Sequence, residues 1–421
     1  MFVNNKGLFN FLALVVAIAI AIIGCHTLEL PSKLSVFTPV TIKLSGWGGN
    51  LVEQKLLKQV LLDFEAQHSN IKVKYEAISD QYMDVIKTRL VGEAAPDVFY
   101  LESVEAPFLM SQNVLEPLEA YITPEFDLAD FEDSLLDSFK YQNHIYGLPK
   151  DYSTLALFYN KKAFAAAGLS NPPATWDELR TYSKQLTGKL NRYGFGENPD
   201  LARQVYKIKA FGGQLVDQNS YATFASEASL QGLELVIDQY QKDRSSAQKS
   251  DVGTNSGSEM FGQSKVAMVI EGNWAIPYLT ETFPQVEFAT AQVPMINNKK
   301  GTMLLSVAYV MNKQAQHKAE AWELICYLTG KVGMQKWTGT GFALPTRKSV
   351  AKNLGYDQDP LRSPLVAGVN YATPWQVGQY PSAIINNFDN QFVSALLGQQ
   401  SLKQAMLKAE NEANQQIKTM E

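Results

Sequence analysis

Apolar and polar residues alternate one by one over residues 40–44 and again over residues 71–75, which predicts two β-strands. Between them, residues 51–68 carry apolar side chains at helical spacing, and residues 81–91 repeat that spacing after the second strand. An apolar run at 98–101 predicts a third strand. This strand–helix–strand–helix–strand order is the unit of a mainly parallel sheet flanked by helices, so the expected fold class is α/β.

The middle of the chain repeats the same two patterns after Pro149. A proline cannot donate a backbone hydrogen bond within a sheet, so Pro149 is expected to end the first block and to mark a crossing between domains. Glu178 follows Thr175 by three residues, a spacing typical of a helix N-terminus. Strands are expected at 155–159, 265–271, 288–293 and 303–311, and helices at 162–168, 175–187, 199–211, 227–241, 318–328, 329–338 and 402–418.

The composition is that of a globular protein large enough for two domains. The chain has 421 residues, of which 46% are hydrophobic and 19% charged. A single hydrophobic core rarely grows beyond about 250–300 residues. The formal net charge is -5, and acidic and basic residues are interleaved without a basic stripe. Nucleic acid is therefore not an expected partner.

The N-terminus has the pattern of a secretory signal. Lys6 precedes an uncharged run over 8–23, which ends in Gly24 and Cys25. The end of this run resembles a bacterial lipobox, which implies cleavage after residue 24 and acylation of Cys25, although Ile23 is bulkier than the usual residue there. An uncleaved signal anchor is the alternative. In both cases the rest of the chain is tethered outside the cytoplasm, with residues 25–37 as a linker.

The chemistry-bearing residue types do not form a catalytic or metal-binding motif. The four histidines have no ligand-like spacing with one another or with a cysteine. No nucleophile elbow, P-loop or zinc-protease motif is present. If Cys25 is lipidated, the other cysteine, Cys326, has no partner and is expected to be a small buried hydrophobe. We therefore expect no enzyme activity, no catalytic residue, no cofactor and no metal.

Polar and aromatic residues do gather near expected strand ends, where such sheets bind ligands. Four carboxylates lie there and could accept hydrogen bonds from sugar hydroxyls, could form a glycosidase pair, or could be solvated loop residues. They are Glu102, Asp151, Glu197 and Glu271. Aromatic rings in loops could stack on the apolar faces of a sugar, and these are Trp47, Tyr152, Trp274, Phe342 and Trp375. Asn50 and Asn273 lie beside them. The remaining tryptophans, Trp176, Trp322 and Trp337, are on expected helices and are assigned to packing.

An ordered set of short motifs resembles the extracellular solute-binding proteins of ABC importers, in the sugar-binding branch that includes maltose- and trehalose-binding proteins. The motifs are Ala95-Pro-Asp-Val, Tyr146-Gly-Leu-Pro, Leu157-Phe-Tyr-Asn-Lys, Pro173-Ala-Thr-Trp-Asp-Glu-Leu, Lys265-Val-Ala-Met-Val-Ile-Glu-Gly-Asn-Trp and Leu344-Pro-Thr-Arg. They occur in the family's order over nearly the whole mature chain.

The resemblance implies a two-lobed periplasmic-binding-protein-like fold whose chain crosses a hinge three times, near residues 146–149, 305 and 328. One lobe would comprise residues 38–149 with 305–328, and the other residues 150–304 with 329–421. It also implies that Trp274 stacks on the sugar and that Trp47 and Glu102 contact it. Phe342 and Trp375 match only by region, and the sequence around Glu197 diverges from the family.

The expected function is that of a substrate-binding lipoprotein, in the periplasm or on the outer face of the cell membrane. It would bind a di- or oligosaccharide or a glycoside in the interlobe cleft, as a monomer, and deliver it to the permease subunits. Two alternatives stay open at this point. One is a secreted glycoside hydrolase that uses loop carboxylates, and the other is a binding protein for a non-sugar solute.

Overall fold

The strand–helix alternation of the first hundred residues is present in the computed structural model, which describes residues 39–47, 51–188 and 192–420. Its elements are β1 (Val40–Trp47), α2 (Leu51–Gln67), β2 (Ile71–Ile78), α3 (Tyr82–Val91) and β3 (Val98–Glu102). β1 pairs in parallel with both β2 and β3. The expected signal peptide, the linker, Cys25 and Asn50 lie outside the described residues.

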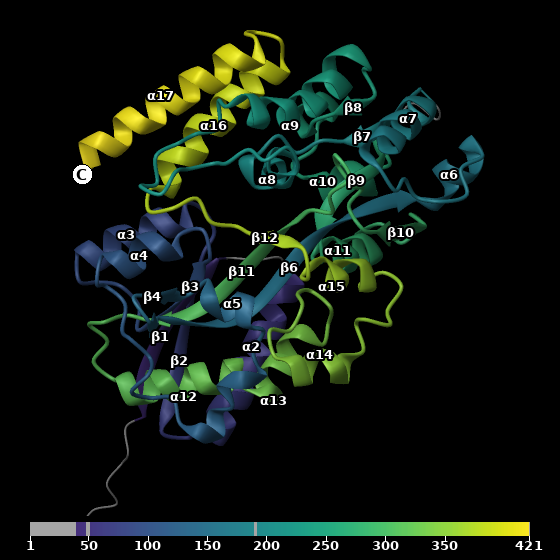
Figure 1. The fold of residues 1–421 in the computed structure, drawn as a ribbon. Helices are drawn as coiled ribbons and strands as arrows, with labels where there is room; N and C mark the ends of the chain where they lie inside the picture. The colour runs from purple at the N-terminus through teal and green to yellow at the C-terminus, as the bar shows by residue number, and fades with distance from the viewer. Residues whose placement is uncertain (1–38, 48–50, 189–191, 421) are drawn as a thin grey trace, which may run out of the picture. The chain divides into compact units, whose positions relative to one another are not determined.

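Two long antiparallel strands, β6 (Gly147–Asn160) and β11 (Thr302–Met311), run side by side through the middle of the sheet (Figure 1). The strand order is β2-β1-β3-β11-β6-β9-β7-β8. The strands beyond β6 are β7 (Tyr193–Gly196), β8 (Ser246–Ala247) and β9 (Val266–Gly272), with β10 (Phe288–Ala291) on β6 and β12 (Ala372–Pro374) on β11. β7 pairs in parallel with β8 and β9, so parallel pairs occupy both outer parts of the sheet.

The expectation that Pro149 interrupts the sheet is wrong. Pro149 lies within β6, opposite Ala308 of β11. The register then shifts, so that Asp151 faces Val307 and Lys150 has no partner in the ladder. A bulge is one of the few places where a sheet accepts a residue without an N–H. The proline therefore marks an irregularity inside one continuous strand.

Four helices between β6 and β9 begin at side chains that accept hydrogen bonds from the first turn. These helices are α6 (Lys161–Ala167), α7 (Trp176–Leu186), α8 (Leu201–Ala210) and α9 (Glu227–Ile237). Their caps are Asn160, Thr175, Asp200 and Ser226. The Thr175 cap is confirmed, since its hydroxyl accepts from the Glu178 N–H at 3.2 Å. Such caps explain why the helix starts are readable from sequence.

The C-terminal part supplies α12 (Lys318–Thr329), α13 (Lys331–Thr338) and a helical hairpin of α16 (Pro381–Leu396) and α17 (Leu402–Met420). The sequence patterns do not identify α16. The shorter elements are α4 (Ala106–Ser111), α5 (Asp133–Asp137), β4 (Lys140–Tyr141), β5 (His144–Ile145), α10 (Gly257–Gly262), α11 (Ala275–Thr282), α14 (Lys348–Leu354) and α15 (Ser363–Gly368). Single helical turns lie at Pro124–Phe126, Leu128–Asp130, Asp238–Lys242 and Lys249–Val252.

Residues Val40–Glu421 form one unit that contains several hydrophobic cores. One core packs α2 and α12 against β1 and β3, through Phe64 and Leu324 among others. Another packs α8, α9, α16 and α17 against the far part of β6, through Leu233 and Phe388 among others. β6 and β11 contribute to both cores. Within the described part of the chain, we find no helix long and apolar enough to cross a membrane.

Candidate functional site

Two neighbouring cavities share a wall made by Trp274 and Phe342. The first, here called the aromatic cavity, has a volume of about 330 Å³. It is lined by Trp47, Glu53, Glu102, Lys150, Asp151, Tyr152, Ser153, Trp274, Leu305, Val307, Trp337, Phe342 and Ala343. The second, here called the polar cavity, has a volume of about 470 Å³. It is lined by Asn198, Asp200, Arg203, Lys249, Asn255, Ser256, Gly257, Ser258, Glu259, Glu271, Trp274, Tyr278 and Phe342.

Trp47 reaches the aromatic cavity from the end of β1. The rings of Tyr82 and Tyr100 meet its indole edge to face, at centroid distances of 5.6 and 5.1 Å. Tyr75 donates to the Trp47 carbonyl at 3.1 Å. A side chain at Gly46 would overlap the Tyr100 ring, so only glycine lets β1 approach β3 this closely. Trp47 is thereby held at the cavity by aromatic packing on β3 and α3.

Lys150 and Asp151 enter the same cavity from the bulge in β6. The Lys150 side chain is only 2% exposed and forms an ion pair with Asp151. Its ammonium lies 3.9 Å from the centroid of the Trp337 ring and 4.8 Å from that of Tyr100. Trp337 donates from its indole nitrogen to Asp151 Oδ2 at 2.6 Å. Sequence spacing assigned Trp337 to packing alone, but α13 also brings it to the cavity wall.

Two glutamates in this cavity have raised pKa values. Confinement among protein atoms, with the charge of Glu105 nearby, raises the pKa of Glu102 to about 7, although its side chain is accessible to solvent. Burial also raises the pKa of Glu53; the charge of Lys150 opposes this shift and that of Asp151 adds to it. The aromatic cavity therefore combines rings with carboxyl groups whose ionisation depends on their neighbours.

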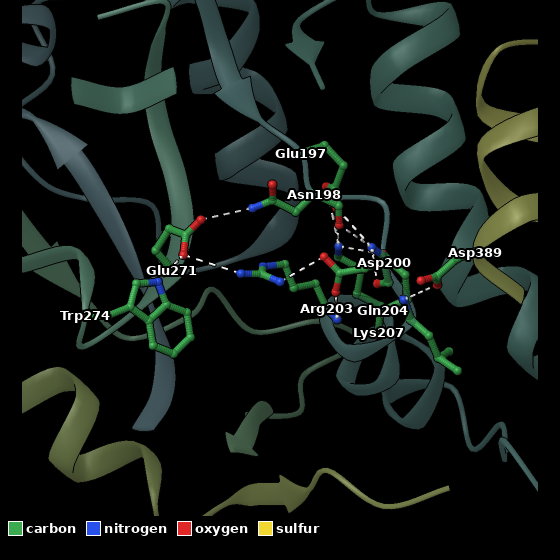
Figure 2. A network of polar contacts seen from close by, with 10 residues as sticks. Glu197, Asn198, Asp200, Arg203, Gln204, Lys207, Glu271, Trp274 and Asp389 are labelled. Carbon is green, nitrogen blue, oxygen red and sulfur yellow. Dashed lines mark hydrogen bonds and ion pairs between the residues drawn. The ribbon is translucent and has the colours of Figure 1, made fainter. Parts of the chain in front are cut away.

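Trp274 lies two residues beyond the end of β9 and lines both cavities. Figure 2 shows its ring beside the Glu271 carboxylate. Its indole N–H donates to Glu271 Oε2 at 2.9 Å. The ring lies over Gly272, where any side chain would overlap it. Trp274 is half-buried and packs against cores on two sides.

Glu271 is the centre of a polar network behind Trp274, as Figure 2 shows. Asn198 donates to Glu271 Oε1 at 3.1 Å, and Arg203 approaches Oε2 at 3.4 Å. Arg203 also donates to Asp200 Oδ2 at 2.8 Å. Burial alone would lower the pKa of Arg203, but the charges of Asp200 and Glu271 outweigh it and hold the pKa above its usual value. The guanidinium is therefore a permanent cation in the wall of the polar cavity.

Glu197 lies in a second layer and lines neither cavity. Its carboxylate is 3% exposed and accepts from Gln204 and Lys207, each at 3.1 Å. Burial lowers the pKa of Lys207, and the charge of Glu197 opposes that shift. Because its oxygens neutralise a buried ammonium, Glu197 has little capacity to accept from a ligand, and its contact with a ligand stays a prediction.

Asn273 and Trp375 hold loops in place. Asn273 is fully buried, lines neither cavity, and donates from its side chain to the Gly341 carbonyl at 2.7 Å. Trp375 is 7% exposed, packs within the core and lines neither cavity. β12 pairs with β11 and turns Trp375 into the core, which does not favour contact of its ring with a sugar; that contact stays a prediction. Direct ligand contact by Trp47, Glu102, Asp151, Tyr152, Trp274 and Phe342 stays a prediction.

Several residues that line the cavities have no sequence pattern that marks them as site residues. Asp200 caps α8 and Arg203 is in the first turn, so both look like ordinary helix-start residues. Lys150 follows the proline of a motif whose sequence predicts only a crossing between domains.

Among the described residues, no group of three or more His, Cys, Asp or Glu side chains could hold a metal ion. Burial raises the pKa of the Cys326 thiol to about 12.

Comparison with known proteins gives one family match and consistent fold matches. Residues 48–335 match the family described as bacterial extracellular solute-binding protein. The arabinooligosaccharide-binding protein of Bacillus subtilis is 25% identical over 353 residues, which cover 79% of this chain and 78% of that protein.

Two solved structures show the fold. One is an ABC substrate-binding protein of Listeria monocytogenes in complex with cycloalternan, with a TM-score of 0.82 and 20% identity over 90% of this chain and 99% of that one. The other is a Mycobacterium tuberculosis protein in complex with glycerophosphocholine, with a TM-score of 0.79 and 17% identity over 91% of this chain and 99% of that one. The fold is the two-lobed α/β fold of periplasmic solute-binding proteins.

Proposed function

Because the chain belongs to the family of bacterial extracellular solute-binding proteins, we propose that it is the substrate-binding component of an ABC importer and that its ligand is a sugar. One observation carries the sugar assignment. Trp47, Trp274 and Trp337 line one cavity together with the carboxyl groups of Glu102 and Asp151.

This combination of side chains suits a sugar for a chemical reason. A pyranose ring presents apolar C–H faces and a rim of hydroxyls, so its site needs both flat apolar surfaces and strong acceptors. Indole rings supply the surfaces, and carboxylates accept from hydroxyls more strongly than neutral groups do. The polar cavity continues beyond Trp274 and Phe342, which favours a ligand longer than one ring, such as a di- or oligosaccharide or a glycoside.

The proposed mechanism is reversible binding with closure of the two lobes. The lining of the aromatic cavity comes from both sides of the shared strands: Trp47 and Val307 pack against one core, and Trp274 and Leu305 against another. A ligand between them bridges the two sides and favours the closed state through its added contacts. The lobe boundaries proposed are residues 38–149 with 305–328 and residues 150–304 with 329–421.

Delivery and location are part of the same proposal. Residues 1–24 act as a signal peptide, Cys25 carries the lipid, and residues 25–37 link the anchor to the folded part. The protein acts as a monomer in the periplasm or on the outer face of the membrane and hands its ligand to permease subunits. The apolar run before Cys25 supports the anchor.

Isothermal titration calorimetry tests the ligand class. The chain from residue 26 onward is titrated with maltose, maltotriose, arabinotriose, galactobiose, glycerophosphocholine, inorganic phosphate and glycine. We expect at least one saccharide to bind and to be recovered unchanged. Binding of a non-sugar alone would overturn the sugar assignment, and cleavage of a bound saccharide would instead support the glycosidase alternative.

A further inference from the structure

We propose that Glu271 is a positioning residue, which sets ligand affinity by fixing the Trp274 indole at the wall shared by the two cavities. This inference rests on the proposed function, because it assigns a role to a side chain beside the expected sugar-stacking ring. Glu271 is 2% exposed and is the last residue but one of β9, three residues before Trp274.

The donors around Glu271 leave its carboxylate little capacity for a ligand. Oε2 accepts from the Trp274 indole at 2.9 Å and from Arg203 at 3.4 Å. Oε1 accepts from Asn198 at 3.1 Å. A side chain at Gly257 would overlap Oε1, so the backbone of α10 covers that oxygen. The carboxylate is thus occupied by protein donors and acts on a ligand through them.

The Trp274 ring has one orientation that satisfies its surroundings. Gly272 leaves space for the ring on one side, and the Glu271 oxygen fixes its N–H end. The ring then presents itself to both cavities. Without the carboxylate, the indole would lose its hydrogen-bond acceptor and could rotate into the polar cavity.

The same carboxylate supports Arg203 from one side, and Asp200 supports it from the other. Asp200 is also the N-cap of α8, and the first N–H of that helix, on Leu201, donates to Asp389 of α16 at 2.8 Å. Glu271 and Arg203 are therefore linked through the start of α8 to Asp389 of the C-terminal hairpin, and Figure 2 shows these side chains. Glu197 and Lys207 form a buried pair next to this network, and Gln204 connects the pair to the Asn198 and Asp200 carbonyls.

A ligand-independent measurement tests the positioning. The chain has six tryptophans, so the full protein gives six indole N–H signals in a nitrogen–proton correlation spectrum, and Trp274→Phe assigns the one of Trp274. We expect this signal to be shifted downfield and to exchange slowly with water. Glu271→Ala should move it to the position of a solvated indole, and Glu271→Gln, which keeps an acceptor oxygen, should leave it in between. An unchanged signal in Glu271→Ala overturns the proposal.

A double-mutant cycle then tests the effect on affinity, with the tightest-binding saccharide of maltose, maltotriose, arabinotriose and galactobiose as probe. Glu271→Ala should weaken binding by about tenfold, Glu271→Gln by less, and Glu271→Ala should add under about twofold in a Trp274→Phe background. The exposed Glu281→Ala on α11 is the matched control and should bind normally.

The outcomes separate this inference from the proposed function. Multiplicative losses in the cycle would mean that Glu271 contacts the ligand itself and would overturn the positioning role. If none of the four saccharides binds the parent protein, the proposed function fails, while the indole signal still decides the position of Trp274. The melting temperatures of all variants show whether a loss of affinity arises from unfolding. Glu271→Gln should destabilise the fold least, because it keeps the size of the side chain and one acceptor oxygen.

Discussion

At the scale of single residues, the environment of a side chain decides its role more than its type does. Trp176 and Trp274 are both tryptophans that start a helix or precede one. Trp176 is buried against Phe195 in the core, whereas Trp274 is half-buried and lines two cavities. Glu197 and Glu271 are both buried but have different partners: Glu197 neutralises Lys207, and Glu271 accepts a hydrogen bond from the Trp274 indole.

Trp274→Ala should separate binding from stability. We expect saccharide binding to weaken by at least about tenfold, which corresponds to about 1.4 kcal/mol, because the ring supplies the wall common to both cavities. The melting temperature should fall much less than in Trp176→Ala, because Trp274 is only half-buried and one part of its ring faces the cavities. Calorimetric titration and thermal unfolding measure the two effects. Trp176→Ala is the matched control and should lose about 3–5 kcal/mol of folding stability; a similar loss in Trp274→Ala would make Trp274 a core residue.

Glu102 should make folding stability depend on pH. Its pKa is raised to about 7 in the fold by confinement and by Glu105, so the folded state holds the proton more tightly than the unfolded chain. The ionisation penalty is absent at acid pH, grows above the ordinary glutamate value of 4.5 and is complete above about pH 7. The neighbouring groups that could modify this behaviour are Lys87, Glu105, Glu53, Lys150, Asp151 and Tyr82.

Glu102→Gln removes that titration. We expect the melting temperature of the variant, relative to the parent, to be higher at pH 8 than at pH 5. Differential scanning calorimetry at both pH values gives the comparison. A constant offset between variant and parent would mean that the carboxyl is ionised with its ordinary pKa in the folded protein.

At the scale of elements, strand ends and helix starts place the site. β1, β3 and β9 deliver Trp47, Glu102 and Trp274 at their carboxyl ends, as expected for parallel strands. The bulge in β6 delivers Lys150 and Asp151, and the start of α8 delivers Arg203. The close approach of β1 to β3 is what brings the first two of these residues to one cavity.

Gly46→Ala tests that close approach. The added methyl group would overlap the buried ring of Tyr100, which has no room to move. We expect a loss of about 1–3 kcal/mol in the free energy of unfolding, measured by urea denaturation, and weaker saccharide binding because Trp47 is displaced. Gly92→Ala is the control, since its methyl group would meet only a carbonyl oxygen at 3.5 Å. Equal stability of the two variants would contradict the packing described for Tyr100.

At the scale of the whole molecule, β6 and β11 connect two hydrophobic cores within one sheet. Each strand contributes its two ends to different cores. Leu148 and Tyr309 belong to the core around α2 and α12, and Leu157 and Met303 to the core around α8 and α16. Such a connection lets two lobes move about shared strands without separating.

Amide hydrogen exchange should show these two strands as the most protected part of the sheet. In β11, residues 307–310 pair with both β3 and β6, and in β6, residues 157–159 pair with both β9 and β10. We expect the backbone amides of these two segments to exchange among the slowest in the protein. Amides of β2 should exchange much faster, because β2 is the edge of the sheet. Mass spectrometry of peptides from each strand measures the difference, and equal protection of β2 and β6 would contradict the central position of β6.

The sequence by itself determined the α/β class, most strand and helix positions before residue 340, and the family to which the chain belongs. It could do so because apolar periodicity, helix caps and short motifs are local properties of the chain. The same local patterns correctly assigned Trp176 to the core.

Only the tertiary structure decided which polar residues meet. Arg203, Glu271 and Trp337 come from separate elements. No local sequence pattern predicts that Arg203 contacts Glu271 or that the Trp337 ring reaches a cavity. Pro149 shows the same limit, because the bulge that accepts it depends on the register of β11, which is more than 150 residues away. Long-range pairing also turned Trp375 inward and gave Glu197 a buried counter-ion, since the burial of a side chain depends on what the rest of the chain places against it.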